Sequence, residues 1–348
     1  MIRESTHPSH TKREIRGCID LGSSYFRLLV VEGVFPASDR LEPEGFALGS
    51  CKEDRRFIGW GEDVAVRGAV SPHKLLEALR RLGELVTVAR GWGCEEPVIV
   101  GTNTLREAAN ASDILARLAA VARRPIRVLS QREEAARGYV GAAFFQGRDD
   151  AICLIDVGGT STELSWGRGL AFAGFHGMPL GVHRVQPLCG GALGARRALR
   201  QVARDLRGAG GMPEPPDGGV YRLPPPRGES TILVTGGTAA SVVIVLRHMR
   251  GSAPPFQELD TVTLDDLALM RRRISGLRRA GRERMLPLDA ERTRLLAAGS
   301  IILEALLGAL RIDAFKVTAR DLRWGVILEA GTSHRDCAGE RYKGEADE

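Results

Sequence analysis

Short apolar runs alternate with stretches of helical spacing along most of this 348-residue chain. Each short apolar run is followed by turn residues, which is the pattern of a buried strand. Because strand and helix patterns alternate, the sequence predicts an α/β fold. The predicted strands cover 99–103, 126–130, 151–158 and 231–237.

Helix start signals accompany the segments of helical spacing. Ser71 is followed by Pro72, so the serine can cap a helix whose first residue is proline. Thr263 is followed by two acidic residues, which favour a helix N-terminus. The predicted helices cover 71–90, 113–123 and 263–273.

An internal repeat is the most informative feature of the chain. Residues 18–30 (CIDLGSSYFRLLV) and 153–167 (CLIDVGGTSTELSWG) each place an acid at the end of an apolar strand, followed by a tight Gly/Ser turn and a second strand. The two acids are Asp20 and Asp156. A third glycine turn, TGGTAAS, lies at 235–241. The repeat predicts two domains of similar fold, with these turns at the mouth of a shared cleft.

The glycine turns predict an anion site. A turn through glycine presents backbone N–H groups without side-chain obstruction, and the acid before it can hold a divalent cation that shields phosphate charge. One such turn is ordinary in a strand–turn–strand unit, whereas a matched pair and a third turn favour a clamp for a phosphoryl chain. The chain has no G-x-x-x-x-G-K-[ST] motif, which excludes a P-loop nucleotide-binding protein.

The domain limits follow from the repeat and from composition. We predict domains over 15–147 and 148–332, with polar tails at 1–14 and 333–348. Residues 208–230 are dense in glycine and proline, so they predict an inserted exposed loop, with a flexible lid as the alternative.

Composition narrows the functional classes. The 43% hydrophobic and 26% charged residues exclude wholesale disorder. The net charge of +6 is the excess of 49 basic over 43 acidic residues, and the basic residues are nearly all arginine, a side chain suited to phosphate. The arginine-rich segment 271–284 is predicted to be a solvated helix face and loop. No basic block is interleaved with aromatic residues, so nucleic acid is not expected as a partner.

No membrane segment is expected, and the six cysteines have the irregular spacing of free thiols in a reducing compartment. The N-terminus lacks an apolar signal region, so we predict a cytoplasmic protein. The apolar stretch 301–310 is assigned to the core, with pairing to a second subunit as the alternative, and a homodimer is therefore left open.

Four further segments complete a family resemblance. With the hairpins and the TGGTAAS turn, their order resembles the exopolyphosphatase / guanosine pentaphosphate phosphohydrolase (Ppx/GppA) family in its short, two-domain form. The resemblance implies two ribonuclease H-like domains of the actin, Hsp70 and sugar kinase superfamily with a cleft between them. The segments are VGTNTLREAANASD (100–113), VLSQREEAARGYVGA (128–142), MPLGVHRV (178–185) and FKVTARDLRWGVILE (315–329).

The resemblance also implies an activity: Mg²⁺-dependent release of terminal phosphate from polyphosphate or from guanosine pentaphosphate, a hydrolysis of phosphoric anhydride bonds. Glu134 would be the general base, with its pKa raised by burial and by the neighbouring Glu133. Arg106 would contact phosphate and neutralise charge on the transferring group. The implied metal ligands are Asp20, Asp156 and Glu163, and the implied phosphate-binding residues are Gly22, Ser23, Gly158, Gly159, Ser161, Gly236 and Gly237.

Departures from the family pattern leave a second hypothesis open. Ser24 and Tyr25 stand where the family has an amide and a serine, Thr160 replaces a glycine, Arg294 replaces an acid, and Ala319 alters the C-terminal motif. The alternative is a degenerate member that binds polyphosphate or nucleotide and acts as a regulator. A sugar kinase is a third alternative, but the sequence offers no recognisable sugar-binding acid.

Overall fold

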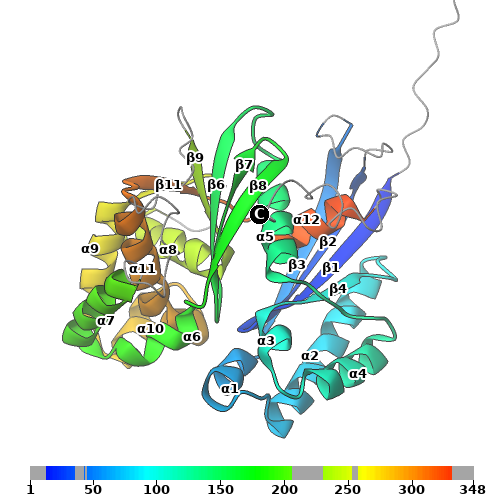
Figure 1. The fold of residues 1–348 in the computed structure, drawn as a ribbon, viewed down its shortest axis with the longest axis horizontal. Helices are drawn as coiled ribbons and strands as arrows, with labels where there is room; N and C mark the ends of the chain where they lie inside the picture. Colours follow the sequence, from blue (N-terminus) through cyan, green and yellow to red (C-terminus); the bar gives the residue numbers. More distant parts are fainter. Residues whose placement is uncertain (1–12, 36–42, 44, 206–229, 253–257, 331–348) are drawn as a thin grey trace, which may run out of the picture.

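Two β-sheets form the centres of two lobes that lie side by side (Figure 1). The first sheet is ordered β3-β2-β1-β4-β5, with β1 to β3 antiparallel and β4 and β5 parallel to β1. Its strands are β1 (Glu14–Leu21), β2 (Tyr25–Val34), β3 (Ala47–Phe57), β4 (Val98–Gly101) and β5 (Arg127–Val128). The computed structural model describes residues 13–35, 43, 45–205, 230–252 and 258–330.

The second sheet repeats this plan. Its order is β10-β11-β9-β6-β7-β8, so an antiparallel unit, β6 to β8, again continues into parallel strands, β9 and β11. The hairpins β1–β2 and β6–β7 are the two copies of the repeat, and both occupy the same place in their sheets. The strands are β6 (Ala151–Val157), β7 (Thr162–Arg168), β8 (Ala171–Met178), β9 (Thr231–Thr235), β10 (Thr261–Thr263) and β11 (Ala314–Val317).

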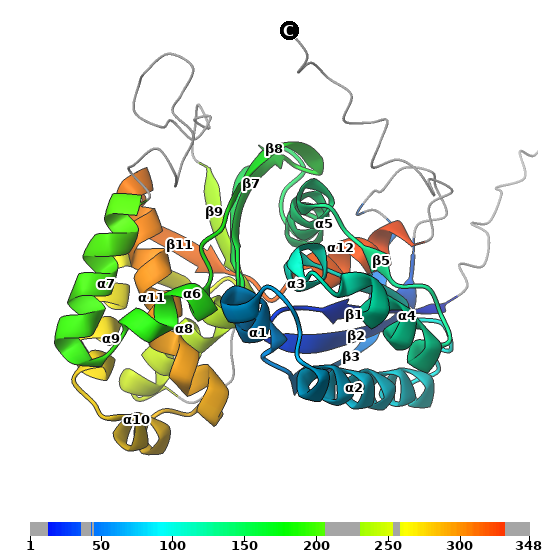
Figure 2. The same ribbon diagram turned by 60° about the horizontal axis from the view of Figure 1, so that its bottom comes forward.

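Helices cover both faces of the first sheet (Figure 2). Alternate residues of a strand point to opposite faces, and here both sets are buried. Leu28 and Val30 face the cluster that contains α2 (Pro72–Gly91) and α4 (Ala111–Ala122), whereas Leu29 faces the opposite cluster. The predicted cap is confirmed, because the Ser71 side chain accepts a hydrogen bond from the first turn of α2.

Two helices fill the space between the sheets. α5 (Gln131–Ala143) packs on α12 (Leu322–Glu329), which also packs on β1, while α5 contacts β8 of the second sheet. The last described helix therefore lies against the first sheet, although chain order assigns it to the predicted second domain. Gly141 and Gly325 permit the contact: a Cβ on Gly141 would lie 2.3 Å from the Asp321 carbonyl oxygen, and one on Gly325 would lie 2.0 Å from that of Arg137.

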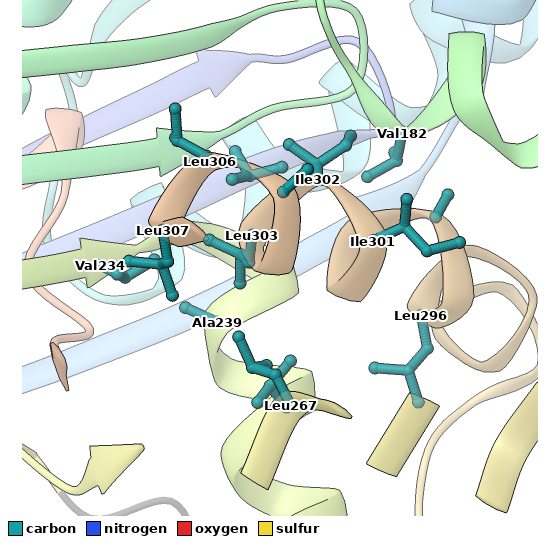
Figure 3. Packing of buried hydrophobic residues seen from close by; sticks show 14 of the residues in the cluster. Val182, Val234, Ala239, Leu267, Leu296, Ile301, Ile302, Leu303, Leu306 and Leu307 are labelled. Carbon is teal, nitrogen blue, oxygen red and sulfur yellow. The ribbon is translucent and has the colours of Figure 1, made fainter. Parts of the chain in front are cut away.

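The core of the second lobe is built around α11 (Ala290–Leu310) (Figure 3). Ile301, Ile302 and Leu306 are fully buried in it, so the core assignment of 301–310 is confirmed. Among the described helices, α11 alone is long and apolar enough to cross a membrane, and 72% of its apolar window is buried inside the protein. Burial to that extent is what a core helix shows.

Five helices of the second lobe surround α11: α6 (Val182–Val185), α7 (Gly191–Asp205), α8 (Gly236–Met249), α9 (Leu264–Ser275) and α10 (Arg279–Met285). The first lobe also contains α1 (Trp60–Arg67) and α3 (Asn103–Glu107). The predicted cap of α9 is confirmed as a reciprocal pair of hydrogen bonds between Thr263 and Asp266.

Some expectations differ from the structure or fall outside it. Glu14, assigned to the N-terminal tail, is the first residue of β1, where it pairs with Gly33. Arg271, assigned to a solvated helix face, is buried and paired with Glu304. Loop 208–230, apart from Ser230, and the tail 333–348 lie outside the described residues.

Gly141→Ala tests the contact between α5 and α12. The added methyl group would overlap the backbone of α12, so we expect the free energy of unfolding to fall by about 1–3 kcal/mol. Gly308→Ala is the matched control, because a Cβ at this position of α11 meets nothing within 4 Å. We expect the control to raise stability by up to about 1 kcal/mol in urea denaturation, since alanine favours helix. Equal stability of the two variants would contradict this packing.

Candidate active site

A cavity of about 420 Å³ lies between the two lobes, where the turns of both hairpins meet the start of α8. It brings together nearly all of the residues predicted from the sequence. Arg106 is the exception, because it stands behind Glu134 and is not part of the cavity lining. The predicted residues that line the cavity are Asp20, Gly22, Ser23, Glu134, Asp156, Gly158, Gly159, Ser161, Glu163, Gly236 and Gly237.

Glycine is required where the turns face the cavity. Gly236 has a φ of +91°, and a Cβ there would lie 2.6 Å from Asp156 Oδ1. A Cβ on Gly159 would lie 2.8 Å from the Cβ of Ser23 in the opposite hairpin. The turns of the two lobes therefore approach one another as closely as backbone allows.

Thr160 fits the second turn without strain. It is absent from the residues with positive φ, so its branched side chain is compatible with the backbone. Its hydroxyl lies 3.0 Å from Ser23 Oγ and accepts a hydrogen bond of 2.8 Å from Asn103 Nδ2. Thr160 thus joins the two lobes instead of narrowing the approach to the glycine turns.

Burial raises the pKa of Asp20 and brings the pKa values of three further carboxyl groups in the cavity near neutrality. The pKa of Asp156 rises to about 6, that of Glu134 to about 7 and that of Glu163 to about 8. The charge of Glu134 raises the pKa of Glu163 further. These three groups can exchange protons near neutral pH.

Glu134 is held at the start of α5 by its neighbours. Ser130 caps the helix in a reciprocal pair with Glu133, and this places Glu134 in the first turn. Arg106 Nη1 donates a 2.6 Å hydrogen bond to Glu134 Oε2 and another of 2.8 Å to the Leu129 carbonyl. Arg106 therefore positions Glu134, a contact that was not predicted from the sequence, and the predicted contact of Arg106 with phosphate stays a prediction.

The expected influence of Glu133 on Glu134 is not seen. The side chain of Glu133 turns away to the Ser130 backbone and to Arg127. The pKa of Glu134 is raised by burial and then by the charges of Asp20 and Asp156. The two acids of the SQREEA motif thus have separate parts, one in the helix cap and one in the cavity.

A charge network at the cavity was missed from the sequence. Arg27 donates to Asp20 at 2.6 Å and to Asp321 at 3.1 Å, and Asp321 is also bound by Arg323. Burial disfavours the ionised form of Asp321, but Arg323 and Arg27 outweigh this and lower its pKa. A signal for Arg27 did exist, since a tight turn after Leu21 pairs Asp20 directly with Arg27 across the hairpin.

Two of the predicted metal ligands, Asp20 and Asp156, offer carboxyl oxygens to a cation at the cavity. Asp20 Oδ1 is buried with no hydrogen-bond partner among the described residues, and Asp156 lines the cavity. Within the described ranges, no group of three or more His, Cys, Asp or Glu side chains is placed to hold a metal by itself. Mg²⁺ commonly takes one or two carboxylates together with substrate phosphates and water, so the pair Asp20 and Asp156 fits a substrate-assisted site. Magnesium itself stays a prediction.

The fold and the site together define a class of protein. Two lobes that share one hairpin arrangement and enclose a cavity lined by glycine turns are typical of the actin-like, ribonuclease H-like fold. The chain belongs to the Ppx/GppA phosphatase family, whose model matches residues 48–334.

The names of two similar proteins agree with this family assignment. A guanosine-5'-triphosphate,3'-diphosphate pyrophosphatase of Vibrio cholerae is 32% identical over 164 residues, which are 43% of this chain and only 28% of that protein. Exopolyphosphatase 1 of Mycobacterium leprae is 26% identical over 329 residues, which are 92% of this chain and 90% of that protein.

Solved structures show the same fold. An exopolyphosphatase from Cytophaga hutchinsonii has a TM-score of 0.71 at 15% identity, covering 91% of this chain and 98% of that chain. A Ppx/GppA family member from Aquifex aeolicus has a TM-score of 0.70 at 18% identity, covering 93% of this chain and 99% of that chain.

Glu163→Gln tests the burial of the acids. The pKa of Glu163 rises from 4.5 to about 8 in the folded protein. The folded chain therefore keeps a proton that the unfolded chain loses, and this contribution to stability is full below about pH 4.5 and is lost as the pH rises through about 8. We expect the variant, which stays neutral, to lose less Tm than the native protein between pH 5 and 9 in thermal unfolding.

Glu133→Gln is the control for this experiment. The pKa of Glu133 is lowered in the folded protein, because hydrogen bonds from Ser130 and the charge of Arg127 outweigh burial. Its contribution is therefore present above its ordinary value of 4.5 and is lost only in acid. We expect this variant to keep the native slope between pH 5 and 9. The same slope in Glu163→Gln would contradict the burial effect.

Proposed function

We propose that this protein is a Mg²⁺-dependent phosphohydrolase that releases terminal phosphate from inorganic polyphosphate or from guanosine pentaphosphate. The observation that carries the proposal is Glu134, a partly buried carboxylate held by Arg106 on the wall of a cavity made of glycine turns. Membership of the phosphatase family supports the same chemistry. A cytoplasmic location and a homodimer stay predictions.

Glu134 is suited to activate water. Its pKa of about 7 lets it accept a proton near neutral pH, where an ordinary glutamate is a much weaker base. Arg106 fixes the carboxylate, so one oxygen is directed by the arginine and the other is left for water. In-line attack on the terminal phosphorus would then pass the water proton to Glu134 and expel the shortened chain.

The glycine turns and nearby cations would hold the phosphates. Gly158, Gly159 and Gly237 present backbone without side chains, and Ser161 adds a hydroxyl group. Arg27 lies at the same cavity with its charge shared by Asp20 and Asp321. A Mg²⁺ ion bound with the substrate by Asp20 and Asp156 would neutralise charge on the phosphate oxygens.

Arg292 supports a polyanionic substrate. It lines the cavity, and its Nε is buried with no hydrogen-bond partner among the described residues. Burial and the charge of Arg55 lower its pKa to about 10, so Arg292 remains charged at neutral pH and an anion would relieve the repulsion. Phosphates beyond the terminal one are the natural partners for this position.

Glu134→Gln is the direct test. We expect the rate of phosphate release to fall by about 10²–10⁴-fold on the susceptible substrate, because glutamine keeps an acceptor for Arg106 but cannot take the proton. The measurement is phosphate release with Mg²⁺ from long-chain polyphosphate and from guanosine pentaphosphate, compared with Glu133→Gln as control. Equal release by the native protein and Glu134→Gln would remove Glu134 as base. Binding of either substrate without turnover by the native protein would favour the regulator alternative.

Arg292→Gln tests the recognition of further phosphates. We expect KM for long-chain polyphosphate to rise about tenfold, the scale of one hydrogen bond to a charged group, with a smaller change in kcat. Arg284→Gln is the control, since Arg284 is exposed on α10 and does not line the cavity. A KM for Arg292→Gln equal to that of the control would show that Arg292 does not contact the chain of phosphates.

A further inference from the structure

Three polar residues from separate elements meet beside the cavity in an arrangement that the family resemblance does not explain. Ser24 lies in the β1–β2 turn, His183 in α6 and Glu62 in α1. Ser24 Oγ is 2.8 Å from His183 Nε2, and His183 Nδ1 is 3.2 Å from Glu62 Oε1. The sequence alone would not find this set, because 159 positions separate Ser24 from His183.

The residues around His183 favour one tautomer of its imidazole ring. The His183 side chain is 1% exposed, and Glu62 Oε1 lies 3.2 Å from Nδ1, although their contact is not well aligned as a hydrogen bond. Contacts with His183 and with Arg294, which donates at 2.5 Å, lower the pKa of Glu62 to about 2, so this carboxylate stays charged. A charged acceptor at Nδ1 favours the tautomer with its proton there, which leaves Nε2 free to accept the proton of Ser24.

Ser24 is also placed where a substrate would reach it. It lines the cavity together with the glycine turns. A Cβ on Gly159 would lie 2.8 Å from Ser24 Oγ and 3.0 Å from His183 Cδ2, so the second glycine turn abuts the Ser24–His183 pair. A phosphate held by that turn would therefore lie next to the hydroxyl group.

We propose that Ser24, His183 and Glu62 form a nucleophilic triad in which Ser24 accepts a phosphoryl group from the phosphoanhydride bound in the cavity. Serine, a histidine base and a carboxylate that orients the base are the constellation that activates a hydroxyl group. His183 is the catalytic base of this step and Glu62 is a positioning residue. The choice of phosphoryl donor rests on the proposed function.

The step is a transfer between oxygen atoms. The Ser24 Oγ–P bond forms while the bridging P–O bond of the terminal phosphoanhydride breaks. The hydroxyl proton passes to His183 Nε2, and the shortened polyphosphate leaves with the electron pair of the broken bond. Ser24 and the water that Glu134 would activate are thus two acceptors for the same terminal phosphate, each with a base of its own.

Mass mapping of Ser24 tests the triad directly. The native protein and Glu134→Gln are incubated with inorganic polyphosphate and Mg²⁺, and a separate sample is treated with a fluorophosphonate, a reagent that labels activated serines whatever the natural donor. We expect peptides containing Ser24 to gain one phosphoryl group in the first case and the phosphonyl label in the second. An unmodified Ser24 in both samples would overturn the proposal.

Variants then separate a nucleophilic role from a structural one. We expect His183→Gln to lower the rate of labelling at Ser24 by at least about tenfold, and Glu62→Gln to do the same while Tm shows a folded protein. His73→Gln, exposed on α2, and Glu291→Gln, which removes the other carboxylate bound to Arg294 but does not touch His183, are the controls. Labelling that is as fast in His183→Gln as in these controls would overturn the triad.

Phosphate release, measured in parallel, distinguishes the two proposals. If the native protein releases phosphate and Ser24 stays unmodified by both reagents, the triad fails alone. If Ser24 is labelled by the fluorophosphonate in a His183-dependent manner but no phosphate is released from polyphosphate, the triad stands and the proposed hydrolysis fails.

Discussion

The burial of carboxylates between two sheets is the constraint on which this structure depends. Moving an ionised carboxylate out of water costs several kcal/mol unless a cation or hydrogen bonds compensate. Asp321 is compensated against burial, because Arg323 and Arg27 bind it and lower its pKa. Arg27 also pairs with Asp20, but burial outweighs this ion pair and the pKa of Asp20 is raised. Asp156 and Glu163 form no ion pair among the described residues, and burial raises the pKa of both, although the charge of Arg27 offsets part of this effect at Asp156.

The ion pairs of Arg27 and Arg323 also attach α12 to the first sheet. Arg27 belongs to β2, whereas Asp321 caps α12 near the end of the described chain. Arg323, in the same helix, donates to the Leu28 carbonyl of β2. Removing one partner of such a buried pair would leave an unpaired charge, at a cost of about 3–5 kcal/mol. The network therefore attaches the returning helix to the first sheet, and it leaves the uncompensated acids facing the cavity where a ligand can use them.

The parts of the site that could be predicted from the sequence are those set by local chemistry. The glycine turns, the acids that precede them and the start of α5 each depend on a few consecutive residues, so their residues reach the cavity as expected. The contacts that cross the chain could not be predicted in this way. Arg27 and Asp321 are 294 positions apart, and only the fold of both lobes brings them together.

Helix and strand limits follow the same division. The starts of α2 and α9 were predicted because their caps are local. The position of α12 was not, because helical spacing predicts a helix without saying which sheet it packs on. The burial of Arg271 was missed for a related reason, since its partner Glu304 comes from another helix.

The departures from the family pattern acquire a common meaning once the lobes are in place. Thr160 meets Ser23 and Asn103, Ser24 meets His183, and Tyr25 Oη donates to Asp289 at 3.3 Å. Arg294 donates to Glu62, again from one lobe to the other. If these substitutions merely marked a loss of function, we would expect unpaired polar side chains at these positions, and a buried unpaired polar group costs stability. Apart from Ala319, each substituted side chain instead has a partner across the cleft, so these residues form a set of contacts between the lobes around an acidic centre that keeps its carboxylates.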